Sequence, residues 1–348
     1  MAFRASIRVM RRIIALLFAL ATPCALAQRN PINDLGAGKY LGFTGGLYEN
    51  GSNVMPGDHR AAGLAAASHI QPLDVNGNPS SNGTMVFLSI GMSNTTQEFC
   101  AAANPAPCTS WSFTGQAMAD ALVNHTTLAI INGARGGQSA ATWDAPSRQN
   151  YDLIRTQNLA PAGLSEKQVQ AAWVKLANPG PTASLPSPNA DAYTLETQMG
   201  NVLRAMKSHY PNLRIVYFTS RIYAGYATST LNPEPYAYES GFAVKWLVQA
   251  QIDERRKSAV VDARAGDLDD ERVAWIAWGP YPWADGLNPR SDGLTWSRGE
   301  FESDGTHPAT AAEQKVGAML LSFLKSEPTA MPWFLASRGV EHRRAVRH

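Results

Sequence analysis

The stretch VFLSIGMSNTTQEF, residues 86–99, changes abruptly from an apolar run to serine, asparagine and threonine. Such a run is typical of a strand that is buried on both faces of a parallel sheet. In these sheets functional groups gather beyond the carboxyl ends of the strands. Ser93 therefore stands where a catalytic side chain is expected, although most serines after a strand only form a turn or a helix cap.

Similar apolar segments recur along the chain and alternate with amphipathic ones. Strands are predicted over residues 85–91, 127–133, 169–175, 213–220 and 272–279. Helices are predicted over residues 115–125, 193–210, 240–257 and 308–325, where apolar residues follow helical spacing. This alternation predicts an α/β fold, with a parallel sheet covered by helices on both faces.

The amino-terminal residues have the pattern of a secretory signal peptide. Four arginines, the last of them Arg12, precede an apolar run over residues 13–21, and small residues follow at the cleavage spacing. We therefore expect a signal peptide over residues 1–27 and a secreted or periplasmic mature chain. The apolar run is too short to span a membrane comfortably.

The remaining sequence divides by composition into three parts. Residues 28–80 are rich in Gly, Asn and Pro and are predicted to form an irregular extension packed on the main domain. The main domain is predicted over residues 81–328. Residues 329–348 are predicted to be a carboxyl-terminal tail, ending in a basic, solvated segment.

The charge balance restricts the classes of partner. The signal peptide contains four of the 30 basic residues and no acid, so the mature chain keeps 26 basic against 28 acidic residues, a net charge of −2. This balance provides no electrostatic basis for nucleic-acid binding. The sequence has no later apolar run near 20 residues, so no integral membrane contact is expected.

Two cysteines remain after the signal peptide, Cys100 and Cys108. In an exported chain such a pair predicts a disulfide, here closing a short loop just after the opening stretch. The alternative is a pair of free, buried thiols.

A second motif supplies the base that a serine nucleophile requires. In SDGTHPAT, residues 303–310, Asp304 and His307 stand three residues apart, just before the last predicted helix. This spacing lets a carboxylate hold the imidazole Nδ1–H while Nε2 faces the serine. A helix-capping turn is the simplest alternative. Metal ligation is another, but no second cluster of His or Cys has suitable spacing, so no metal or other cofactor is predicted.

Glycines follow the second predicted strand, in NGARGGQSAATW, residues 132–143. Gly136 and Gly137 let the backbone turn sharply and point an amide N–H at an anion. Paired glycines are common in loops, so this signal gains weight only from its position between the other two motifs.

The blocks IGMSN, RGGQSA and DGTHP occur in an order that resembles the SGNH hydrolase superfamily, the GDSL-like esterases, over residues 84–325. In motif style the chain is most similar to the carbohydrate acetylesterase branch. The resemblance implies a flavodoxin-like three-layer α/β/α sandwich with a five-stranded parallel sheet. It also implies ester hydrolysis without a metal.

The resemblance assigns a role to each matching residue. Ser93 would be the nucleophile, His307 the general base and Asp304 the acid that orients it. The N–H groups of Ser93 and Gly137 would hold the oxyanion. The third block departs from the family, because AAWVKLAN, residues 171–178, has Lys175 where an Asn or Gln donor is usual. Lys175 is therefore predicted to be an oxyanion donor, and the alternative is a lysine that only extends into solvent.

The substrate is inferred from aromatic residues ahead of the DGTHP block. Trp283 and Trp296 are predicted to stack on sugar rings. Trp275 and Trp278 fall within a predicted strand and are expected in the core.

The sequence thus predicts an exported esterase that deacetylates a carbohydrate, with a small-molecule or polysaccharide ester as substrate. An acyltransferase would use the same triad. The rival class is a secreted carbohydrate-binding module of the same fold, without catalysis, in which Lys175 marks a decayed oxyanion hole.

Overall fold

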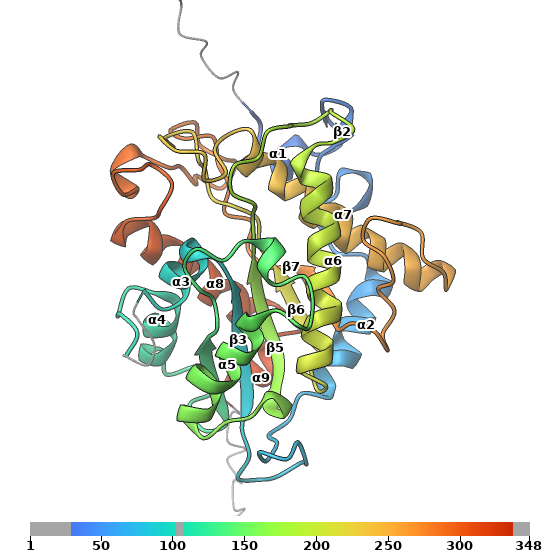
Figure 1. Ribbon diagram of the computed structural model, residues 1–348, viewed down its shortest axis with the longest axis vertical. Helices are drawn as coiled ribbons and strands as arrows, with labels where there is room; N and C mark the ends of the chain where they lie inside the picture. Colours follow the sequence, from blue (N-terminus) through green and yellow to red (C-terminus); the bar gives the residue numbers. More distant parts are fainter. Residues whose placement is uncertain (1–28, 102–106, 337–348) are drawn as a thin grey trace, which may run out of the picture.

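The computed structural model describes residues 29–101 and 107–336, and its centre is a five-stranded sheet (Figure 1). The strands run in the order β4-β3-β5-β6-β7, and each neighbouring pair is parallel. Their bounds are β3 Met85–Gly91, β4 Leu128–Asn132, β5 Val169–Lys175, β6 Ile215–Phe218 and β7 Trp275–Trp278. The predicted fold class, an α/β sandwich with five parallel strands, is confirmed.

Helices cover both faces of this sheet. Figure 1 shows α5 (Gln149–Ile154) and α6 (Asp191–His209) in front of it and α8 (Thr310–Ser326) and α9 (Met331–Phe334) behind it. The rear face is rich in aromatic contacts, and Phe87 of β3 packs against Phe99, Phe113 and Trp333. Helix α7 (Tyr236–Lys257) packs beside α6, and α3 (Ser93–Phe99) and α4 (Phe113–Ala119) pack beside α8.

The outer edge of β7 is protected by side chains from two helices. Gln251 of α7 accepts a hydrogen bond from the Ile276 N–H (2.8 Å) and donates one to the Ala274 carbonyl (3.0 Å). His59 of α2 (Gly57–Ser68) lies 2.8 Å from the Ile276 carbonyl through Nε2. These bonds satisfy backbone groups that an open edge would offer to another chain.

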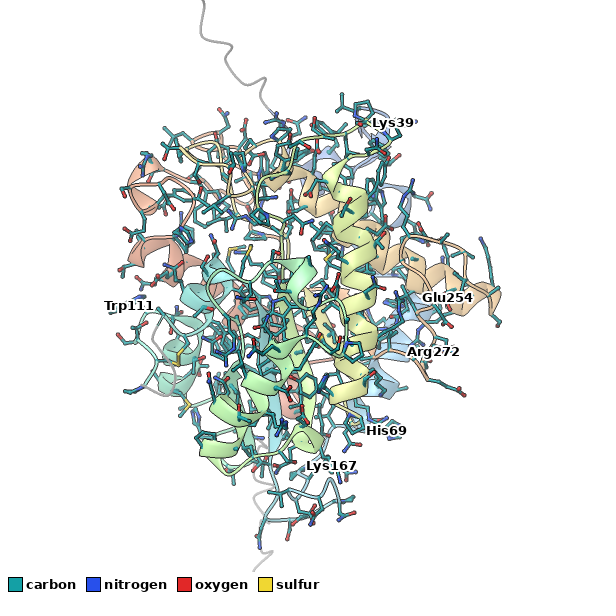
Figure 2. All side chains as sticks on the ribbon, in the orientation of Figure 1. Lys39, His69, Trp111, Lys167, Glu254 and Arg272 are labelled. Atoms are coloured by element: carbon teal, nitrogen blue, oxygen red, sulfur yellow. A yellow bond between two sulfur atoms is a disulfide. The ribbon has the colours of Figure 1, made fainter. Side chains whose placement is uncertain are left out.

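The amino-terminal extension is more regular than its composition predicts. It contains α1 (Ile32–Leu35), the short antiparallel pair β1 (Lys39–Tyr40) and β2 (Phe43–Thr44), and the three-turn helix α2. Figure 2 shows Lys39 at the top of the molecule and His69, which follows α2, in its lower part. The extension therefore runs along the sheet as part of the same domain. Helix α2 was missed because its alanine-rich sequence lacks a strong apolar stripe.

The carboxyl-terminal boundary also differs from the prediction, which placed the tail from residue 329. Thr329 lies 2.8 Å from the Tyr217 hydroxyl, and Trp333 and Phe334 of α9 are buried against the sheet. Residues 329–336 therefore belong to the domain, because their aromatic side chains complete its rear layer. The predicted signal peptide and the last twelve residues lie outside the described residues.

The predicted disulfide is present between Cys100 and Cys108, directly after α3. The segment that follows it is attached to α8, since the Trp111 indole N–H donates to Glu313 at 2.6 Å. Trp111 is labelled in Figure 2. Within the described residues, no helix has the length and apolar character needed to cross a membrane.

Candidate active site

Ser93 opens helix α3 at the carboxyl end of β3, as its position in the opening stretch predicts. The connection is tight because Gly91 has no side chain: a Cβ there would lie 2.4 Å from the Lys175 carbonyl oxygen. Thr95 fixes the same corner by donating its hydroxyl to that carbonyl at 2.7 Å. Ser93 occupies the first turn of the helix, so its backbone N–H has no acceptor within the helix.

Ser93, His307 and Asp304 form a continuous hydrogen-bonded chain. The Ser93 Oγ lies 2.7 Å from His307 Nε2, and His307 Nδ1 lies 2.5 Å from Asp304 Oδ2. The structure therefore brings together two motifs that are more than 200 residues apart in the sequence. Among the described residues, no group of three His, Cys, Asp or Glu side chains is arranged to hold a metal ion.

The turn that carries the acid and the base is fixed by its own backbone. Asp304 Oδ1 accepts the N–H groups of Thr306 (2.9 Å) and His307 (3.0 Å). Burial alone would raise the pKa of Asp304, but these bonds and the imidazole hold it below its usual value. Gly305 has a φ of +66°, and a Cβ there would lie 1.8 Å from the Tyr226 carbonyl oxygen. Only glycine fits this turn, which explains the second letter of the DGTHP block.

The glycine loop after β4 lies beside the nucleophile. A Cβ built on Gly136 would lie 4.0 Å from the Cβ of Ser93. Gly137 follows with a φ of +75°, and a Cβ there would meet no atom within 4 Å. Its N–H finds no acceptor among the described residues. The backbone N–H groups of Ser93 and Gly137 are thus both free to bind an anion.

These groups surround a small cavity of about 80 Å³. Ser93, His307 and Gly137 line it, together with Gln138, Asn178, Arg221 and Asn232. A larger groove of about 840 Å³ lies between the amino-terminal segment, the end of β7 and α8, and it contains no residue of the triad.

Lys175 does not point into this cavity, which corrects the predicted role. It is 0% exposed, and its Nζ binds both carboxylate oxygens of Glu98, which is also 0% exposed. Burial lowers the pKa of Lys175 to about 8 and raises that of Glu98, while their mutual attraction opposes both shifts. The alternative, a lysine extending into solvent, is also wrong, because the side chain turns inward toward α3.

Asn178 lines the cavity, but its amide nitrogen is already engaged. Its Nδ2 donates to Gln198 Oε1 at 2.8 Å and to Asp191 Oδ1 at 3.1 Å. An amide group has two N–H donors, so both are used. The side chain of the third block therefore leaves no donor for the oxyanion in this arrangement.

Trp283 and Trp296 do not have the sugar-stacking role that the sequence predicts. Both are 0% exposed, and neither lines the cavity. The Trp283 indole donates to Glu234 at 2.8 Å, and the Trp296 indole donates to the Pro282 carbonyl at 2.9 Å. These rings form the core of the long loop after β7, so neither presents a face to a sugar. Trp275 and Trp278 are buried, as expected.

Arg221 is the cavity residue that the sequence interpretation missed. It follows β6 and is 1% exposed. Its Nε and Nη2 atoms are buried, and the described residues provide no hydrogen-bond partner for them. The available signal was a charged residue three positions beyond an apolar strand, at the same edge of the sheet as Ser93.

Comparison with known proteins gives likenesses in structure only. No protein-family model matches the sequence, and no curated protein matches it. A GDSL-like lipase from Parabacteroides merdae is 13% identical, with a TM-score of 0.36 over 75% of this chain and 99% of that one. A carbohydrate acetylesterase from Sinorhizobium meliloti is 16% identical, with a TM-score of 0.34 over 69% and 97%.

A carbohydrate esterase of family 2 from Myceliophthora fergusii is 12% identical, with a TM-score of 0.38 over 73% of this chain and 68% of that one. At such low identities and TM-scores, residue roles in this chain rest on its own geometry.

Proposed function

We propose that this chain is a serine hydrolase of carboxylic esters. The observation that carries the proposal is the hydrogen-bonded chain from Ser93 through His307 to Asp304, which opens onto a cavity. A serine hydroxyl is a weak nucleophile until an adjacent base removes its proton, and the base in turn needs a group that orients it. All three requirements are met by residues at one edge of the sheet.

The chemistry follows from these positions. His307 Nε2 takes the hydroxyl proton as Ser93 Oγ attacks the ester carbonyl carbon, and the carbonyl electron pair moves to the oxygen. The N–H groups of Ser93 and Gly137 stabilise that oxyanion. When the intermediate collapses, the bond between the carbonyl carbon and the alcohol oxygen breaks, and His307 returns the proton to the departing alcohol. The acyl group remains on Ser93. Water, activated by His307, then releases the acid.

The small cavity favours a short acyl group such as acetyl. A carbohydrate as the alcohol is supported by the motif style alone, because Trp283 and Trp296 are buried. The disulfide and the basic-apolar pattern of residues 1–27 support export. No observation favours the binding-module alternative, since Lys175 lies outside the cavity and marks no decay of the site.

Hydrolysis of p-nitrophenyl esters of increasing acyl length tests the proposal. We expect acetate to be the best substrate, and Ser93→Ala to lower kcat by at least ~10⁴-fold without loss of the fold. Acetylated oligosaccharides, with and without an alcohol acceptor, then separate hydrolysis from acyl transfer. Absence of activity on all of these esters, or wild-type rates in Ser93→Ala, would contradict the proposal.

A further inference from the structure

The cavity contains a buried cation without a partner. Arg221 is 1% exposed, and no side-chain hydrogen bond or ion pair joins its guanidinium to the described residues. Its backbone is held firmly, because its N–H donates to Ser240 Oγ at 3.1 Å. Arginine keeps its charge even when burial lowers the pKa, as burial does here. A buried charge is normally paired, so its presence in the cavity requires a reason.

The charges around Arg221 do not neutralise it directly. Glu98 lies close enough to attract the Arg221 guanidinium electrostatically, but its carboxylate is bound by Lys175 and forms a neutral pair with it. Glu234 is occupied by the Trp283 indole and the Ala224 N–H. Asp304 is bound to His307 and to its own turn. Each nearby acid therefore makes its hydrogen bonds elsewhere, and none of them occupies the donors of the Arg221 guanidinium.

We propose that Arg221 stabilises the oxyanion of the tetrahedral intermediate, in the role that the third sequence block has in similar enzymes. This inference rests on the proposed esterase function. Ser93 and Arg221 line the same cavity of about 80 Å³, so an acyl group bound to Ser93 would share this small space with the guanidinium. Lys175 points away, and both amide hydrogens of Asn178 are engaged, so Arg221 is the cationic donor that remains among the described lining residues.

The role involves no proton transfer. As the Ser93 Oγ–carbon bond forms, the carbonyl electron pair becomes a full charge on oxygen, and the guanidinium donates hydrogen bonds to it. A buried, charged donor stabilises this state more than the neutral ester. The interaction is made mainly in the transition state, so its loss should lower kcat and leave KM nearly unchanged.

The test compares wild type with Arg221→Met, Arg221→Lys and a control, Lys245→Met. Lys245 is a second buried lysine, on α7, and it binds the carbonyls of Thr44 and Gly45 outside the cavity. We expect Arg221→Met to lower kcat for p-nitrophenyl acetate by ~10²-fold with KM within about threefold. Arg221→Lys should recover part of the rate. Lys245→Met should change stability but not kcat.

A boronic acid provides a readout independent of turnover, because it forms a tetrahedral, negatively charged adduct with a reactive serine. Its affinity should fall in Arg221→Met by the same factor as kcat. Unchanged kcat and boronate affinity in folded Arg221→Met would overturn the inference. Loss confined to esters that carry a carboxylate, expressed in KM, would also overturn it and make Arg221 a substrate-binding residue. If wild type hydrolyses no ester, the proposed function fails instead.

Discussion

Two buried cations lie at the ends of neighbouring strands, and their surroundings differ completely. Lys175 ends β5 and is bound to both oxygens of Glu98, with neither side chain exposed. Arg221 follows β6, lines the cavity that contains Ser93, and has buried nitrogens without a partner in the described structure. Sequence interpretation chose Lys175 as the functional cation, whereas the structure favours Arg221.

The difference shows how pairing separates structural charges from functional ones. A buried ion pair satisfies its own electrostatics and keeps little capacity to bind a ligand. An unpaired buried cation destabilises the resting protein, and such a cost is tolerated where the charge is used in the reaction. Substitutions of paired or neutral buried groups should therefore act differently from substitutions of Arg221.

Removing Lys175 should destabilise the fold strongly. Lys175→Met leaves the Glu98 carboxylate buried and unpaired, which we expect to cost about 3–5 kcal/mol of unfolding free energy. Arg221→Met removes an unpaired charge and should change that free energy little or raise it. Chemical denaturation measures both, and Lys175→Met with Glu98→Gln should restore most of the loss. If Lys175→Met is no more destabilising than Arg221→Met, the distinction between a structural Lys175 and a functional Arg221 is contradicted.

His59 illustrates a third solution, in which a buried base is neutral instead of paired. It stacks on Trp275, and burial lowers its pKa from 6.5 to about 4. As the pH falls below 6.5, the unfolded chain gains a proton that folded His59 does not accept until about pH 4. Stability present above pH 6.5 is therefore lost on acidification, by about 2 kcal/mol between pH 7 and pH 5. In His59→Gln this part of the pH dependence should vanish from denaturation curves, and its persistence would assign it to other groups.

Asn178 also lines the cavity, so the effects of Asn178→Ala and Arg221→Met on kcat can be compared directly. Since its amide hydrogens bind Gln198 and Asp191, Asn178→Ala should lower kcat by less than ~10-fold, against ~10²-fold for Arg221→Met. Initial rates with p-nitrophenyl acetate give both values. A loss in Asn178→Ala that matches or exceeds the loss in Arg221→Met would show that the amide turns into the site during the reaction.

The sequence predicted the sheet and the closeness of Ser93, His307 and Asp304 because both depend on local patterns. Buried strands have a recognisable composition, and the carboxyl ends of parallel strands meet at one edge whatever lies between them. The disulfide followed from the cysteine count and the export signal. Gly91 and Gly305 belong to the same short motifs, and the structure shows why glycine is needed there, since a side chain at either position would collide with backbone.

The errors share a different cause, the direction taken by a side chain. Lys175 stands at the expected strand end, but its Nζ binds the carboxylate of Glu98, a residue of α3 that lies 77 positions earlier in the sequence. Trp283 and Trp296 lie near the site in sequence, yet the Trp283 indole donates to Glu234, just before α7, and the Trp296 indole donates to the Pro282 carbonyl in the loop after β7. Such partners depend on the tertiary fold. Arg221 was missed for the same reason, because only the fold shows that its nitrogens lack a partner.

The most direct test of the catalytic account is covalent labelling with a fluorophosphonate, followed by peptide mass spectrometry. Activated serines react with this reagent, whereas ordinary serines do not. The account predicts one adduct, on the peptide that contains Ser93, with matching loss of esterase activity and no labelling in His307→Ala. An unmodified Ser93 in protein that hydrolyses esters, or inactivation through another residue, would contradict it.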